Sequence, residues 1–204
     1  MKAILLVCAT LYLSPTMAQS GFRKGFLLST KGDTIPGFIQ YSGNSKHNQY
    51  CSFRKTTTQP DVHYKPGEIN GFRFENDQYY VTKSVGKSSD VFLEVLVKGN
   101  ITLYRFNKIY YIEKGDSLLF ELSDEKDVVE MHGQRIKKKS KNFARLLTVL
   151  MADCPKVQDQ IPALDLKEKL IIDLVQRYNQ CIGSTSTTYR SKWYGKQKRQ
   201  PRPG

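Results

Sequence analysis

An alternation of apolar and polar residues with a period of two constrains this chain more than any other feature, and it extends from Phe22 to about Leu122. Successive side chains of a β-strand point to opposite faces, so this period is typical of strands that bury one face. Turns rich in Gly, Asn and Asp separate the apolar runs, which favours antiparallel pairing. Residues 56–67, which are rich in Thr and contain two prolines, predict a long loop. The pattern places strands at 26–28, 35–41, 50–55, 72–74, 79–82, 91–97, 101–106, 109–113 and 118–122.

The period changes to that of an α-helix after Ser123. From Phe143 to Met151 the apolar residues recur at i, i+3, i+4, i+7 and i+8, which gives a helix one apolar face. We expect this helix to end by Pro155, since a proline inside a helix removes a hydrogen bond and clashes with the preceding turn. The pattern therefore predicts an amphipathic helix after the strands.

A second apolar helix face extends over residues 166–178. Asp165, followed three residues later by Glu168, has the spacing of a capping box, and Gly183 is suited to the helix end. Strands followed by amphipathic helices are typical of an α+β fold. We predict an antiparallel β-meander of about eight or nine short strands, followed by two amphipathic helices packed on the sheet.

The N-terminal residues have the order of a secretion signal. Lys2 precedes an apolar run at 3–13. Thr16 and Ala18 then place small residues three and one positions before a cleavage site at Gln19. The apolar run has about half of the ~20 residues that a membrane-spanning helix requires. We therefore expect residues 1–18 to be a signal peptide and the mature chain to be exported, without a transmembrane helix, to the periplasm, the outer membrane or the medium.

Three cysteines remain after such a cleavage: Cys51, Cys154 and Cys181. In an oxidising compartment one pair is expected, with one thiol left over. Cys154 and Cys181 flank one helical unit and are the pair that we expect, whereas Cys51 lies in a strand pattern and suits a buried position. Because both paired cysteines would lie at the C-terminal ends of their helices, such a bond requires residues 155–164 to run back along the first helix.

The net charge of +13 is concentrated in two basic segments. One spans residues 135–145, the other begins at Tyr189, and together with Lys2 they account for the whole excess of positive charge. Outside these two segments and Lys2, basic and acidic residues balance. We therefore predict a single β-rich α+β domain at 19–183 and a basic, disordered tail at 184–204. Both segments are predicted to bind a polyanion or an anionic membrane surface, whereas export argues against nucleic acid. The predicted binding residues are Arg135, Lys137, Lys138, Lys139, Lys141, Arg190, Lys192, Trp193, Lys196, Lys198, Arg199 and Arg202.

The motifs of common catalytic centres are missing from the sequence. It contains no glycine-rich phosphate loop, no nucleophile elbow and no zinc-binding helix. His47, His63 and His132 lie in predicted loops without neighbours at ligand spacing, and we expect their side chains to be solvated. The acidic residues of 124–127 lack the regular spacing of a calcium loop and are interpreted as a solvated turn. We therefore predict no catalytic residues, no metal and no cofactor.

Several short motifs occur in a characteristic order: Lys31-Gly32-Asp33-Thr34-Ile35, Gly37-Phe38-Ile39, Pro66-Gly67-Glu68-Ile69, Gly71-Phe72, Val97-Lys98-Gly99, Asp153-Cys154-Pro155 and Tyr178-Asn179-Gln180-Cys181. Their order and spacing over residues 21–181 resemble the N-terminal exported domain of uncharacterised envelope proteins from Bacteroidota. In many of these proteins the domain precedes an outer-membrane β-barrel. This chain departs from the family after Cys181, where basic residues stand in place of a barrel, so no pore or transport role is carried over. In the family the two cysteine motifs occur together, which supports the expected pair.

These observations favour a non-catalytic exported domain that works at the cell envelope and binds an envelope protein or a surface component. A second hypothesis is that the basic tail binds a polyanion or a membrane surface. A third is an enzyme whose site is assembled from distant residues, which a deep cleft with perturbed carboxylates or a histidine would support.

Overall fold

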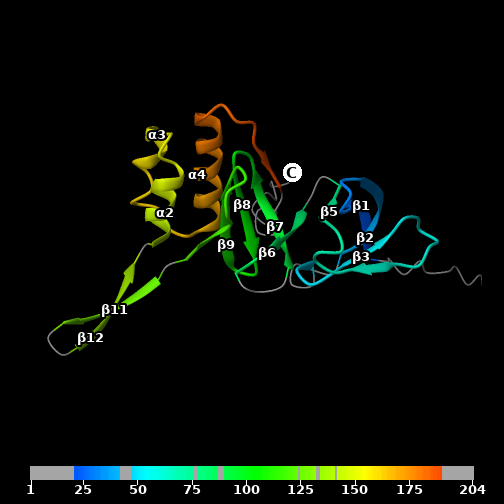
Figure 1. Cartoon of the computed structure of the whole chain (residues 1–204), viewed down its shortest axis with the longest axis horizontal. Helices are drawn as coiled ribbons and strands as arrows, with labels where there is room; N and C mark the ends of the chain where they lie inside the picture. The colour runs from blue at the N-terminus through cyan, green and yellow to red at the C-terminus, as the bar shows by residue number, and fades with distance from the viewer. Residues whose placement is uncertain are drawn as a thin grey trace, which may run out of the picture.

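The computed structural model of the chain describes residues 21–41, 47–75, 78–86, 90–123, 125–131, 134–140 and 142–189. The predicted signal peptide at 1–18 lies outside these residues. One large sheet dominates the fold, and a two-stranded hairpin projects from the body (Figure 1). The strands are β1 (Phe22–Leu28), β2 (Thr34–Gln40), β3 (Cys51–Arg54), β4 (Val62–Tyr64), β5 (Gly71–Phe74), β6 (Tyr79–Ser84), β7 (Asp90–Lys98), β8 (Ile101–Phe106), β9 (Ile109–Lys114), β10 (Phe120–Leu122), β11 (Glu125–Met131), β12 (Gln134–Ser140) and β13 (Thr187–Thr188). The helices are α2 (Asn142–Leu150), α3 (Pro155–Gln158) and α4 (Glu168–Cys181).

Hydrogen bonds order the large sheet as β10-β9-β8-β7-β6-β5-β1-β2-β3-β4, with β13 paired to β7. All of these neighbours are antiparallel, which confirms the predicted antiparallel α+β architecture. Consecutive strands are neighbours from β1 to β4 and again from β5 to β10. The meander is broken once, because β5 pairs with β1 and not with β4. The pairing of β1 with β5 therefore joins two meanders into one sheet.

Two short strands lie where the sequence predicts a loop or a tail. β4 belongs to the predicted loop at 56–67 and pairs with β3. β13 lies beyond the predicted domain end at 183, and its two threonines pair with Lys98 and Val97 of β7. This corrects the predicted boundary, because backbone hydrogen bonds hold the chain on the sheet past that point. The rest of the predicted tail, residues 190–204, lies outside the described part of the chain.

β11 and β12 form a separate antiparallel hairpin in a region for which the sequence predicts an acidic turn. The turn expected at 124–127 is corrected to a strand, since all but its first residue belong to β11. The register places Glu130 opposite Arg135 and Asp127 opposite Lys138. Four cations of the basic segment at 135–145 lie on β12.

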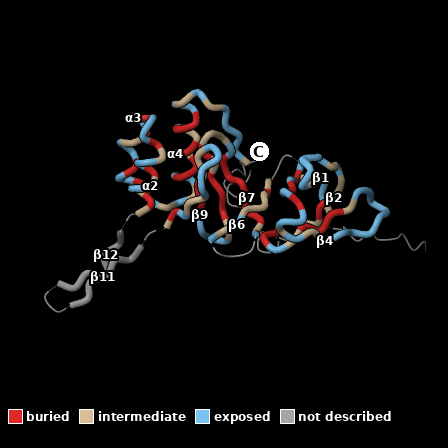
Figure 2. Tube along the Cα trace, viewed as in Figure 1, coloured by how far each residue is buried: buried red, intermediate tan, exposed pale blue. Residues whose placement is uncertain are grey.

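The helices pack on one face of the C-terminal half of the sheet, as the sequence predicts. Leu147 of α2 and Val175 of α4 are fully buried against Leu103 of β8 and Ile112 of β9. Figure 2 shows this layer as buried stretches in α4 and in the strands beside it. A second cluster, which includes Phe72, fills the N-terminal half, and a smaller third cluster lies on the opposite face of β7, β8 and β9. The sheet is continuous, but its two halves have separate cores.

A disulfide joins Cys154, which follows α2, to Cys181 at the end of α4, and their Cα atoms are 6.3 Å apart. This is the pair expected from the sequence. Because both cysteines lie at the C-terminal ends of their helices, the bond holds these two ends together. The connection at 159–167 runs back to the start of α4, so the two helices point in the same general direction (Figure 1). Cys51 on β3 is buried, as expected.

The end of α4 agrees with the sequence prediction, whereas its start does not. Gly183 has a φ of 72°, and two backbone hydrogen bonds close the helix there in a Schellman motif. At the start, Lys167 precedes the helix without a side-chain cap, so the capping box predicted from Asp165 is wrong. The physical reason is that the Glu168 carboxylate is turned inward, where it accepts a hydrogen bond from Arg105.

Asn179 links α4 to the turn between β7 and β8. Its side-chain Nδ2 donates to the carbonyl oxygen of Ile101 at 2.9 Å, and its Oδ1 accepts from the N–H of Ile101 at 2.9 Å. Gly99 lies so close to this amide that a Cβ there would be 2.4 Å from Nδ2. On the same helix turn, the Tyr178 hydroxyl donates to Asp153 at 2.9 Å. Three of the motifs that carry the family resemblance therefore meet near the disulfide.

Candidate functional site

The structure describes only some of the residues predicted to bind a polyanion. Arg135, Lys137, Lys138 and Lys139 lie on β12, and their register pairs two of them with acidic residues of β11. The others fall outside the described residues: Lys141, Arg190, Lys192, Trp193, Lys196, Lys198, Arg199 and Arg202. Polyanion binding by these segments stays a prediction.

His47 corrects the expectation that the histidines are solvated. His47 is 1% exposed. The centroid of its ring lies 5.3 to 5.8 Å from the centroids of four aromatic rings, those of Tyr41, Phe72, Phe74 and Tyr80. It is therefore a core residue of the N-terminal half. His63 has an exposed side chain but lies on β4, where its Nε2 is 3.0 Å from Asp61. His132 lies outside the described residues.

A buried charge cluster lies beneath the start of α4. Arg105 of β8 is 5% exposed, and its guanidinium donates to Glu94 of β7 at 2.5 and 3.1 Å and also to Glu168 of α4. The Nε2 of Gln78 donates to the other carboxylate oxygen of Glu94 at 3.1 Å. Burial raises the pKa of Glu94, and the facing guanidinium offsets this only in part. The cluster therefore holds two carboxylates around one arginine.

Carboxylates with a perturbed pKa are candidates for catalysis when they face a cleft. The side chains of Glu94 and Arg105 are 4% and 5% exposed, and that of Glu168 is 14% exposed. Each carboxylate is already paired with the same guanidinium, and α4 covers the group. We therefore interpret this charge cluster as a structural link between the sheet and α4.

A more accessible site is a groove of about 400 Å³ on the outward face of the N-terminal strands. In its centre, a cross-strand pair of glycines presents bare backbone. The residues on either side of this pair share the outward face, because alternate residues of a strand point the same way. They provide two phenylalanine rings, a proline ring and a lysine. The β1–β2 groove, as we name it, is lined by Lys24, Gly25, Phe26, Pro36, Gly37, Phe38, Lys55, Thr56 and Glu75.

The core beneath the groove requires both glycines. A Cβ on Gly37 would be 2.4 Å from the ring of Phe53, and one on Gly25 would be 2.6 Å from the side chain of Ile39. Such distances are far below normal van der Waals contact, so a larger residue would push the strands away from the core. The glycines therefore let β1 and β2 lie directly on the core.

Guanidinium groups lie against the aromatic rings of this face. Arg73 of β5 is 5.2 Å from the centroid of the Phe26 ring. Arg54 of β3 is 4.0 Å from the centroid of the Phe22 ring and 5.9 Å from that of Phe38. These distances are within the range of cation–π interactions. The contacts hold rings and cations side by side on one surface of the sheet.

Further charges lie on the rim of the β1–β2 groove. Lys24 and Lys55 are exposed, and Glu75 is the single carboxylate among the lining residues. With Arg54 and Arg73, this face carries four cations around an apolar floor. A positive field above apolar walls favours a ligand that has anionic groups on a ring-shaped or apolar scaffold.

The β1–β2 groove is not predicted from the sequence, because its residues come from separate segments of the chain. A local signal was present, since Phe22, Lys24 and Phe26 alternate along β1 on the face opposite to buried Leu27. Aromatic residues on a strand face that is not the core face indicate a second contact surface. The contribution of β5 could not be seen in this way, because its pairing with β1 is not local.

No group of three or more His, Cys, Asp or Glu side chains in the described residues is arranged to hold a metal ion. Within the same residues, no helix is both long and apolar enough to cross a membrane. Comparisons with protein-family models, with curated proteins and with solved structures find no match to this chain.

Proposed function

We propose that this chain is an exported, non-catalytic domain of the cell envelope that binds an acidic polysaccharide in the β1–β2 groove. The observation that carries the proposal is the ring-lined groove with exposed lysines on its rim. Its volume of about 400 Å³ lies within the usual range of ligand sites, which are mostly apolar with a few polar groups.

The chemistry of the lining favours a saccharide. The face of an aromatic ring carries negative charge, so it attracts the polarised C–H groups on the face of a sugar ring. Lys24 and Lys55 can each bind a carboxylate of such a chain. An extended peptide, in contrast, gains much of its affinity by pairing with a free strand edge. The groove lies on the face of paired strands, which suits a chain of rings better than an added strand.

The test is binding of an oligogalacturonate, measured by isothermal titration calorimetry against a neutral malto-oligosaccharide of the same length. We expect Lys24→Gln/Lys55→Gln to weaken oligogalacturonate binding about tenfold, because two exposed ion pairs contribute about 0.7 kcal/mol each. Added salt is expected to weaken binding to the unmodified protein, since it screens exposed charges.

The matched control is Lys31→Gln/Lys108→Gln, which removes two exposed lysines in turns outside the groove. This variant is expected to bind like the unmodified protein. Equal affinity for the neutral oligosaccharide, or equal loss in both variants, would contradict the proposal. If the protein binds poly-glutamate tightly but does not bind oligogalacturonate, the ligand of the groove is an acidic polypeptide and not a polysaccharide.

Export is a separate part of the proposal, supported by the order of residues at the N-terminus and by the disulfide. We expect the native protein to begin at Gln19 and to fractionate with the periplasm, the outer membrane or the medium. Intact mass spectrometry after cell fractionation measures both properties. A native chain that retains Met1 and stays in the cytoplasm would rule out export, whatever the groove binds.

A further inference from the structure

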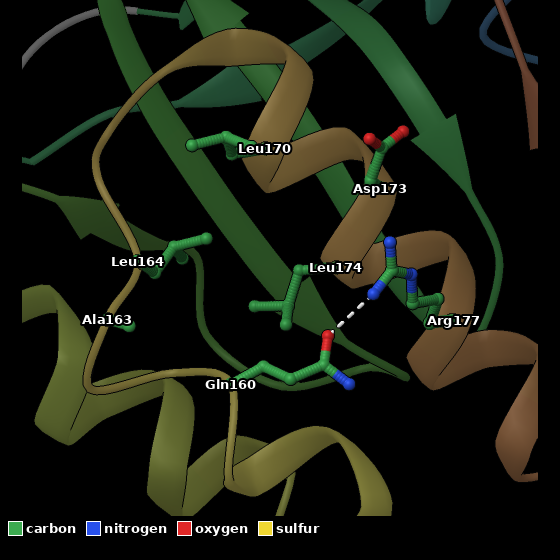
Figure 3. A pocket seen from close by; sticks show the side chains of 7 residues that line it. All are labelled: Gln160, Ala163, Leu164, Leu170, Asp173, Leu174 and Arg177. Atoms are coloured by element: carbon green, nitrogen blue, oxygen red, sulfur yellow. Dashed lines mark hydrogen bonds between the residues drawn. The ribbon is translucent and has the colours of Figure 1, made fainter.

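A second pocket, of about 200 Å³, lies between α4 and the connection at 159–167. Leu164, Leu170 and Leu174 supply its apolar part, and Figure 3 shows Leu174 in the middle, with the other two on one side. Leu170 is 39% exposed although it is a large apolar residue on a helix. The pocket is therefore an open apolar surface and not a sealed cavity.

Charges of both signs lie on the other side of this pocket. Asp173 and Arg177 are one turn apart on α4, a spacing that commonly gives an ion pair on a helix. The Arg177 guanidinium is instead turned toward Gln160 and donates to its Oε1 at 2.7 Å (Figure 3). The hydrogen bond fixes one nitrogen of Arg177 and leaves its others available to a ligand.

We propose that this pocket binds a zwitterionic apolar amino acid, such as leucine. Its carboxylate would accept hydrogen bonds from Arg177, its ammonium group would pair with Asp173, and its side chain would lie on the three leucines. A free amino acid carries both charges beside one apolar side chain, which is the combination that the pocket offers. A volume of about 200 Å³ suits one such molecule and is smaller than typical pockets for larger ligands, which begin at about 300 Å³.

Other ligands match only part of this arrangement. The C-terminus of a peptide has a carboxylate but no neighbouring ammonium group, so it would leave Asp173 without a counter-charge. An aliphatic chain would use only the leucines. The inference does not depend on the β1–β2 groove, because none of the residues that line the two sites is shared.

The experiment is a titration of the full mature protein with L-leucine, N-acetyl-L-leucine and L-leucinamide, followed by NMR shifts of the backbone amides. L-leucine is expected to shift amides of 160–164 and 170–177. The two analogues lack the ammonium group or the carboxylate, so each is expected to bind about tenfold more weakly, as for the loss of one hydrogen bond to a charged group.

Matched variants identify the groups that hold the two charges. Arg177→Gln and Asp173→Asn are each expected to weaken binding of L-leucine about tenfold, whereas Lys169→Gln and Asp165→Asn, exposed residues outside the pocket, leave it unchanged. The amide spectrum of each variant shows that it is folded. Absence of shifts in the pocket amides, or equal binding of all three compounds, would overturn the proposal. The proposal would also be overturned if N-acetyl-L-leucine bound as tightly as L-leucine and its affinity were unchanged by Asp173→Asn. That result would indicate that the pocket binds the C-terminus of a peptide.

Discussion

Arg105→Met is expected to lower the free energy of unfolding by about 3–5 kcal/mol, because it leaves buried carboxylates without a counter-charge. Both Glu94 and Glu168 accept hydrogen bonds from this guanidinium, and methionine keeps much of the apolar volume but none of the donors. Urea unfolding followed by circular dichroism measures the change. The control is Arg145→Met on the exposed side of α2, for which we expect a change below about 0.5 kcal/mol.

The same variant is expected to depend on pH with a defined sign. Burial already raises the pKa of Glu94 above its value in the unfolded chain, and loss of the facing cation raises it further. A carboxyl group whose pKa is raised by folding contributes most stability when protonated, and this contribution is lost as pH rises through the folded pKa. Arg105→Met should therefore lose more stability than the unmodified protein between about pH 5 and about pH 8. An equal loss of stability in both proteins would contradict the assignment of Glu94 as the carboxylate that is left without a counter-charge.

Reduction of the disulfide is the second large effect, and it is expected to lower the free energy of unfolding by about 3–4 kcal/mol. Cys154 and Cys181 are separated by 27 residues, and opening a loop of this size restores entropy to the unfolded chain. Unfolding curves with and without a reducing agent measure the difference. Cys154→Ala/Cys181→Ala should show a similar loss and no further response to the reductant.

The Cys51→Ala variant separates the effect of reducing the disulfide from any effect of the free thiol of Cys51. Cys51 is buried, and burial raises the pKa of its thiol, so we expect it to be unreactive in the folded protein. The Cys51→Ala variant should therefore keep the full response to the reductant. Should the unmodified protein unfold at the same urea concentration with and without reductant, the bond between α2 and α4 would have no measurable role in stability.

The strand pattern predicts most of the sheet, because apolar alternation reports which face is buried. Along β8, for example, Ile101 and Leu103 are both fully buried under the helices. The pattern could not place Glu94, a carboxylate in an otherwise apolar strand, since its partners are Arg105 of β8 and Gln78, which precedes β6. The prediction of a solvated His47 was wrong for a related reason. The direct neighbours of His47 in sequence are polar, whereas three of the four rings around it belong to β5 and β6.

The hairpin of β11 and β12 was missed because its strands carry little apolar alternation. Most residues of both strands are charged or polar, so each strand looks like a solvated segment when it is considered alone. Both candidate sites were missed for topological reasons. The β1–β2 groove gathers residues from β1, from β2 and from the positions that follow β3 and β5. The second pocket needs the returning connection at 159–167.

Backbone hydrogen bonds join the large sheet without a break, but its two halves pack around separate cores and form two packing units. The helices and the disulfide act on the cluster around Leu147 and Val175, whereas β1 to β4 depend on the aromatic cluster around Phe72. Local opening of a protein follows such packing units, each with its own free energy. Strands β1 to β4 can therefore fray from the rest while the cross-linked half stays closed. A ligand bound between Phe26 and Phe38 would stabilise the N-terminal half of the protein against this opening, whereas the disulfide stabilises the other half.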